Sequence, residues 1–208
     1  MRPLLDLAAA LGTRSEGLID LRMQEARDAG LEAEVGELLL MALFVTGFPA
    51  GLEAARRWGG MRTVPPQGEG ARVADVAARG RESCSAVYGP QFDALVENLA
   101  ELHPDLPELV VTTGYGAMMA RPGLALPVRE LCMVAMLVPW RAETPLYSHI
   151  RGALRVGVPP SDVEEAMVAG LEALARVAPD EGAAARVMDI WTAVRRRVEE
   201  KHLRDEET

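Results

Sequence analysis

The sequence has few of the residues that usually mark a disulfide scaffold or a β-sandwich. Phe, Trp and Tyr make up only 4% of its 208 residues, and it has two cysteines, three histidines and one lysine. Cys84 and Cys132 lie far apart and form no Cys-x-x-Cys pair, which argues against a disulfide framework and a cysteine-rich metal site. With so few aromatic residues the core must consist of Leu, Val, Ala and Met, which favours close-packed helices.

Other absences limit the partners and the chemistry. The formal net charge of −9 argues against a surface for nucleic acid or anionic lipid. The N-terminus lacks the pattern of a signal peptide, and the longest apolar run, near 38–48, is too short to span a bilayer. We therefore expect a soluble, cytoplasmic protein. The sequence has no His-Glu-x-x-His, phosphate-binding Gly-Lys-Ser or Gly-x-Ser-x-Gly motif, and the histidines lack metal-ligand spacing, so we expect no cofactor and no metal.

Apolar residues recur at helical spacing almost throughout the chain, between breaks made by Gly and Pro. The segment LVVTTG at 109–114 is β-prone, but it has no partner strand, so the predicted fold is all-α. The predicted helices cover 14–30, 32–46, 49–59, 70–87, 91–102, 106–119, 127–138, 142–156, 160–175 and 181–203.

One pattern occurs twice, as RSEGLIDLRMQEARDAG at 14–30 and as RAETPLYSHIRGALRVG at 141–157. A constant shift pairs Gly157 with Gly30, but it pairs His149 with Arg22 and, upstream, Glu130 with Pro3. An internal repeat first describes architecture. We expect a degenerate half copy at 1–60, a linker rich in Pro and Gly at 61–69, and a complete domain with a C-terminal helix at 70–208.

Four blocks follow one another in the sequence: VYGPQFDAL, PELVVTTGYGAMMARPGL, VRELCMVAML and SHIRGALRVGVPPSDVEEAM. In this order, over roughly 70–175, they resemble the carboxymuconolactone decarboxylase family. The related alkylhydroperoxidase D-like proteins use a Cys-x-x-Cys pair just before the histidine, whereas residues 145–148 here contain no sulfur. The resemblance implies an alkylhydroperoxidase D-like helical bundle with an N-terminal partial duplication. It also implies a homo-oligomer such as a trimer or hexamer and a small carboxylated substrate.

The catalytic candidates are His149 and Glu130. An imidazole gives or takes a proton near neutral pH, and the resemblance places His149 in the family's most diagnostic block. Its alternative is a core or cap histidine. Glu130 lies in an apolar run, where a carboxylate needs a partner. It either orients His149 or forms a structural ion pair with an arginine, for which Arg129, Arg141 and Arg151 are the candidates.

Four further residues are candidates for substrate binding, each with a structural alternative. Arg121 is suited to binding a carboxylate through its planar fork, or to capping a helix. Tyr115 and Met119 lie where the resemblance places bulky residues near a pocket, although Met at helical spacing is more often core. Trp140 either covers a pocket or packs at a helix end.

The favoured hypothesis is cofactor-free decarboxylation of a small carboxylated lactone, with His149 as the proton donor or acceptor. One alternative is a non-catalytic helical scaffold that kept only the fold, because half of the chain already lacks the candidate residues. The other is a peroxidase-like redox function through Cys84 or Cys132. The missing Cys-x-x-Cys argues against that function.

Overall fold

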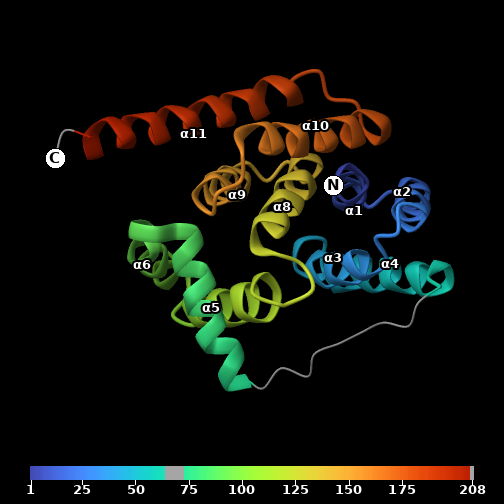
Figure 1. Cartoon of the computed structure of the whole chain (residues 1–208), viewed down its shortest axis with the longest axis horizontal. Helices are drawn as coiled ribbons and strands as arrows, with labels where there is room; N and C mark the ends of the chain where they lie inside the picture. Colours follow the sequence, from blue (N-terminus) through green and yellow to red (C-terminus); the bar gives the residue numbers. More distant parts are fainter. Residues whose placement is uncertain (64–72, 207–208) are drawn as a thin grey trace.

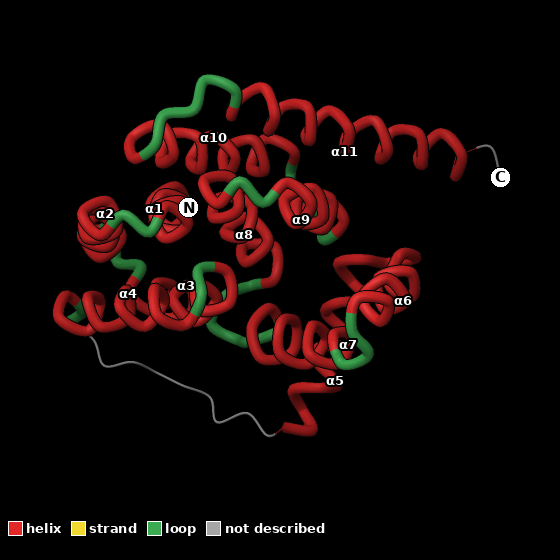
Figure 2. Tube along the Cα trace, turned by 180° about the vertical axis from the view of Figure 1, so that it is seen from behind, coloured by secondary structure: helices red, strands yellow, loops and turns green. Residues whose placement is uncertain are grey.

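The computed structural model describes residues 1–63 and 73–206, and within them every element is a helix (Figure 2). The predicted all-α fold is therefore confirmed. Most of the predicted linker, from residue 64 on, lies outside the described residues. The elements are α1 (Arg2–Thr13), α2 (Glu16–Asp28), α3 (Glu32–Val45), α4 (Phe48–Met61), α5 (Val73–Tyr88), η1 (Gly89–Gln91), α6 (Phe92–Leu102), α7 (Leu106–Glu108), η2 (Leu109–Met119), α8 (Leu126–Trp140), α9 (Glu143–Arg155), α10 (Pro160–Val177) and α11 (Ala183–Glu206).

Helix α8 is the centre of the bundle (Figure 1). It packs against α1, α9 and α10, and almost every residue from Arg129 to Val138 is buried. Helix α1 is equally apolar, and its buried side chains are all Leu or Ala. The core is thus built from small and aliphatic residues, as the scarcity of aromatics predicts. Two charged residues, Arg129 and Glu130, interrupt the apolar surface of α8, and both are completely buried.

The segment at 109–119 is a π-helix rather than an α-helix. The predicted helix at 106–119 is correct in extent, but only its first turn, α7, is α-helical. Its four successive β-branched residues crowd an α-helical turn, which lowers their preference for it. The backbones of η2 and α5 also touch, since a Cβ on Gly80 would lie 2.2 Å from the carbonyl oxygen of Val111. π-helical turns are rare and are frequent at functional sites.

In the register of the sequence repeat, the first three helices overlap α8, α9 and α10, although α8 begins earlier than its counterpart and α10 ends later. The shift that pairs Arg14 with Arg141 also pairs the first and last residues of α2 with those of α9. Arg14 and Arg141 end their helices in the left-handed region, with φ of 59° and 57°. Within the described residues these are the only residues other than glycine with positive φ.

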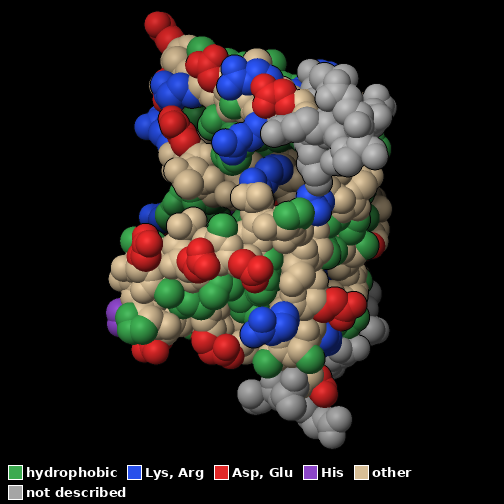
Figure 3. Space-filling view, turned by 90° about the vertical axis from the view of Figure 1, so that its left-hand side faces the viewer, with side chains coloured by type: hydrophobic (Ala, Val, Ile, Leu, Met, Phe, Trp, Pro, Cys, Tyr) green, Lys and Arg blue, Asp and Glu red, His purple; other side chains and the backbone are tan. Residues whose placement is uncertain are grey.

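Acidic and basic side chains are interspersed on the face of the molecule shown in Figure 3. Lys and Arg together number 22, against 31 Asp and Glu. None of the helices in the described part of the chain combines the length and the apolar character needed to cross a membrane.

Candidate active site

Glu130 and His149 are held together where α8 and α9 pack. The Nδ1 atom of His149 lies 2.8 Å from Oε2 of Glu130. The Glu130 side chain is completely buried, whereas the His149 side chain is 14% exposed. Gly152, on the next turn of α9, allows this approach, because a Cβ there would lie 3.2 Å from Oε2 of Glu130. The two catalytic candidates thus form a pair with one end open to solvent.

The geometry sets the roles of the two imidazole nitrogens. An ionised carboxylate only accepts hydrogen bonds, so we assign a proton to Nδ1, whose N–H donates the hydrogen bond to Oε2 of Glu130. Nε2 then faces away from Glu130 and can take up or release a proton. The other Glu130 oxygen, Oε1, is buried without a hydrogen-bond partner among the described residues. A buried carboxylate held by a single imidazole is a costly arrangement that fold stability alone does not require.

None of the three arginines considered as partners of Glu130 binds it. Arg129 donates to Glu37 at 2.8 Å, and Arg141 lies 3.4 Å from Asp180. The Arg151 guanidinium lies 5.9 Å from the centre of the Tyr88 ring. Among the candidate partners, only His149 contacts the carboxylate of Glu130.

Tyr115 lies close to this pair. It is 5% exposed and makes an edge contact with Tyr88, with ring centres 6.0 Å apart and planes at 74°. Burial is the largest cause that raises the pKa of the Tyr115 phenol well above its usual value, and the charge of Glu130 adds to it. Tyr115 is therefore a neutral hydroxyl in the surroundings of Glu130, which makes it a hydrogen-bond donor.

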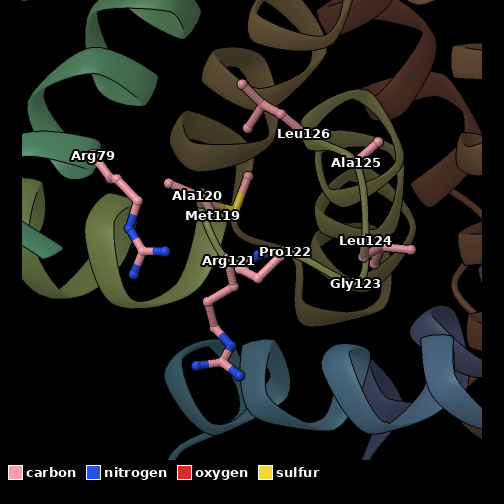
Figure 4. A pocket seen from close by; sticks show the side chains of 9 residues that line it. All are labelled: Arg79, Met119, Ala120, Arg121, Pro122, Gly123, Leu124, Ala125 and Leu126. Carbon is pink, nitrogen blue, oxygen red and sulfur yellow. The ribbon is translucent and has the colours of Figure 1, made fainter. Parts of the chain in front are cut away.

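Arg121 and Met119 lie together in a different place. They line a cavity of about 480 Å³ with Arg79 and the loop from Ala120 to Leu126 (Figure 4). The Arg121 side chain points to α3, where its Nε and Nη2 donate to Glu37 at 3.0 and 3.1 Å. A carboxylate of the chain itself thus already occupies the planar fork predicted to bind a substrate. His149 does not line this cavity.

Trp140 also lies apart from His149. The Arg14 guanidinium stacks 3.8 Å from the centre of its ring. Both residues line a cavity of about 410 Å³ where the C-terminal ends of α1, α8 and α10 meet. A cation stacked on an aromatic face stabilises the packing of these ends. Trp140 thus both lines a cavity and packs at the end of α8, on a side of the bundle whose cavity His149 does not line.

Both cysteines are free and completely buried. Burial is the main cause that raises the pKa of each thiol to about 12. Since the thiolate is the reactive form, neither cysteine has the character of a redox centre. The described side chains also contain no group of three or more His, Cys, Asp or Glu arranged to hold a metal ion.

Two residues near His149, Tyr88 and Ser148, have no assigned role in the sequence analysis. The structure places the Tyr88 ring, at the end of α5, in an edge contact with Tyr115, and the Arg151 guanidinium lies 5.9 Å from its centre. Burial raises the pKa of the Tyr88 phenol, and the Ser148 hydroxyl acts in the opposite direction. In the sequence, a tyrosine before Gly-Pro indicates only a turn. That Tyr88 lies near α9 follows from the structure alone. Ser148 could have been noted from the sequence as a candidate, because it places a hydroxyl group immediately before His149.

Comparison with known proteins gives one match. Residues 104–190 match the model of the carboxymuconolactone decarboxylase family, whereas neither the curated proteins nor the solved structures include a match. The matched residues run from the segment before α7 to the first turns of α11, and they exclude α5, α6 and the N-terminal helices. They include both Glu130 and His149, so the candidate pair lies within the part of the chain that is similar to the carboxymuconolactone decarboxylase family.

Proposed function

We propose that the chain is a cofactor-free decarboxylase of a small carboxylated lactone and that Glu130 and His149 are its proton-transfer pair. The observation that carries the proposal is the 2.8 Å contact between the His149 Nδ1 and a fully buried carboxylate. This contact fixes the ring orientation and leaves Nε2 on the partly exposed side. A histidine oriented by a carboxylate is a common arrangement for acid–base catalysis.

In the proposed reaction the bond between the lactone ring and its carboxylate breaks, and carbon dioxide leaves. The electron pair of that bond passes into the conjugated lactone carbonyl and forms a dienolate. The protonated imidazole of His149 then gives its Nε2 proton to the ring carbon, and the neutral imidazole regains a proton from solvent. Glu130 stabilises the imidazolium through the Nδ1 hydrogen bond. One proton is consumed for each carbon dioxide released.

We also propose that residues 1–60 are a partial copy of the unit that contains the site, and that 70–208 is the complete one. The matching bounds of α2 and α9 and the two left-handed arginines support this proposal. In the N-terminal part, Arg22 lies 3.7 Å from Asp6 of α1. That ion pair joins α1 to α2, as the imidazole–carboxylate pair joins α8 to α9.

The test is carbon dioxide release from carboxymuconolactone, together with deuterium incorporation into the product in D2O. We expect His149→Gln to lower kcat at least about 100-fold, the range of a lost general acid. Glu130→Gln should lower it by about tenfold or more, because an amide no longer stabilises the imidazolium. The matched control is His103→Gln, since His103 is 58% exposed at the end of α6.

Each variant needs the same thermal unfolding curve as the unmodified chain, so that lost turnover is not lost fold. Equal kcat in His149→Gln and His103→Gln would remove the histidine from the mechanism. Absence of carbon dioxide release by the unmodified chain, at enzyme concentrations comparable to the substrate, would favour the scaffold alternative.

A further inference from the structure

The cavity between α5 and the start of α8 takes no part in the mechanism above. Its volume of about 480 Å³ is within the range that holds a small ligand. Arg79 lines it from α5, and Arg121 lines it from the loop that follows η2 (Figure 4). Met119 and Leu126 also belong to its walls, whereas His149 does not. Two arginines from elements that are distant in the sequence thus border one cavity.

Helix α8 begins at the wall of this cavity, with Ala125 as its N-cap and Leu126 as its first residue. Its first turn contains no acidic residue, and no side chain makes a capping hydrogen bond there. Backbone N–H groups in the first turn of a helix have no partner within the helix, and the helix dipole places partial positive charge at this end. The start of α8 therefore adds N–H donors and positive potential to the two arginines.

A third guanidinium lies behind the loop that forms the cavity wall. Arg129 is completely buried. It donates to three carbonyl oxygens of that loop, those of Arg121, Pro122 and Leu124. Its Nη1 has no hydrogen-bond partner among the described residues. Burial is the main cause that lowers the pKa of Arg129, and the charge of Arg121 adds to it, although Glu37 opposes both. Further negative charge near this loop would therefore be stabilising.

We propose that the cavity binds a phosphate group, either as the free ion or as a monoester with a small apolar body. Phosphate oxygens accept hydrogen bonds from guanidinium groups and from the N–H groups at a helix N-terminus. Arg79, Arg121 and the start of α8 present such donors from three elements, which suits a tetrahedral group better than a planar carboxylate. Met119 and Leu126 form the apolar side, against which the organic part of a monoester packs. The inference goes beyond the proposed function, because this ligand is distinct from the lactone.

The test is isothermal titration calorimetry of the full chain with inorganic phosphate, phenyl phosphate and benzoate, at an ionic strength fixed with sodium chloride. We expect Arg79→Gln to raise the Kd of the phosphate ligands about tenfold or more, the range for hydrogen bonds to charged groups. Arg79→Lys should recover part of the loss. The matched control is Arg81→Gln, because Arg81 is exposed on the same helix. A lower Kd for phenyl phosphate than for inorganic phosphate identifies a monoester site, and equal values identify the free ion.

A second variant adds negative charge to the cavity without weakening the fold. Ala125 has φ of −63° and ψ of 145°, an extended conformation in which Asp caps a helix well. Ala125→Asp should therefore raise the midpoint of thermal unfolding and abolish phosphate binding, because its carboxylate takes the N–H groups of the first turn. Ala125→Asn provides the cap without the charge and should raise the Kd less than Ala125→Asp does.

The proposal is overturned if the unmodified chain binds neither phosphate ligand, or if Arg79→Gln and Arg81→Gln have equal Kd values. Unchanged phosphate binding in Ala125→Asp would also overturn it, as would benzoate that binds as tightly as phenyl phosphate. His149→Gln should bind phosphate as the unmodified chain does. Loss of binding in that variant would place the ligand at the catalytic pair instead, so the cavity and the proposed function are tested separately.

Discussion

Glu37 joins the N-terminal helices to the segment that contains the candidate site, so removing its charge should destabilise the whole chain. It lies on α3 and accepts hydrogen bonds from Arg121 at 3.0 and 3.1 Å and from Arg129 at 2.8 Å. The Glu37 side chain is 12% exposed and that of Arg129 is completely buried. Glu37→Gln keeps the shape of this side chain and removes its charge.

The expected loss follows from what remains around Arg129. Breaking a buried ion pair typically costs about 3–5 kcal/mol, because the other charge is left buried without compensation. Arg129 keeps the carbonyl oxygens of Arg121, Pro122 and Leu124 as acceptors. We therefore expect a loss at the lower end of that range, about 3 kcal/mol. Glu37→Gln combined with Arg129→Met should recover part of it, since no unpaired buried charge remains.

The assay is urea unfolding followed by circular dichroism. The control is Glu53→Gln, because Glu53 is 46% exposed and lies 3.6 Å from Arg57; it should change stability by less than about 0.5 kcal/mol. Burial opposes ionisation of Glu37, but the hydrogen bonds and charges of Arg121 and Arg129 outweigh it and lower the pKa of its carboxyl. The stabilisation is then present above the unfolded pKa of about 4.3 and lost as the pH falls below it.

The difference between Glu37→Gln and the unmodified chain should therefore shrink below about pH 4. A loss at pH 7 no larger than that of Glu53→Gln would refute the reasoning. So would a difference that persists unchanged at pH 3, because below the unfolded pKa the unfolded chain binds a proton at Glu37 and this linkage reduces the stabilisation by the ion pair.

Two further predictions concern packing and the thiols. Gly12→Ala should destabilise the chain by about 1–3 kcal/mol in urea unfolding, because a Cβ there would lie 2.2 Å from the carbonyl oxygen of Met136. Gly17→Ala, with open space around it, should instead stabilise α2 by about 0.5–1 kcal/mol, and equal effects of the two would contradict this account. Cys84 and Cys132 should not react with Ellman's reagent in the folded chain at pH 8, because their thiols have pKa values of about 12. Rapid reaction before unfolding would show an accessible thiolate.

The helices could be predicted from the sequence because their signals are local. Gly30 and Gly157 end repeated patterns, and both adopt the positive φ that favours glycine at a helix end. The π-helical form of 109–119 could not be predicted, because a π-helix and an α-helix share their apolar residues and their boundaries. The π-helix depends on the contact of η2 with α5, which no spacing within 109–119 encodes.

In the candidate site, too, local contacts could be predicted from the sequence and contacts between distant residues could not. The sequence left the partner of Glu130 open between His149 and an arginine. The contact with His149 is local, because α8 and α9 are adjacent in the sequence and a short connection keeps them together in space. The partner of Arg121 is Glu37, which lies 84 residues away in the sequence. The residues next to Arg121 therefore could not show which carboxylate pairs with it. Tyr88 was missed for a similar reason. It lies at the end of α5, and the residues of η2 and α8 separate it in the sequence from α9.

The copy that contains His149 and Glu130 differs from the N-terminal copy in the helix that packs over it. The repeat pairs Gly152 with Glu25. A Cβ on Gly152 would lie 2.6 Å from Cγ1 of Val87 on α5, so the helix that covers Glu130 requires a glycine there. Glu25 is instead free to bind Arg22, at 2.5 Å. An ion pair open to water costs little, whereas a buried carboxylate needs a partner and a closed surrounding. The imidazole–carboxylate pair of α8 and α9 therefore depends on the packing of α5 against Gly152.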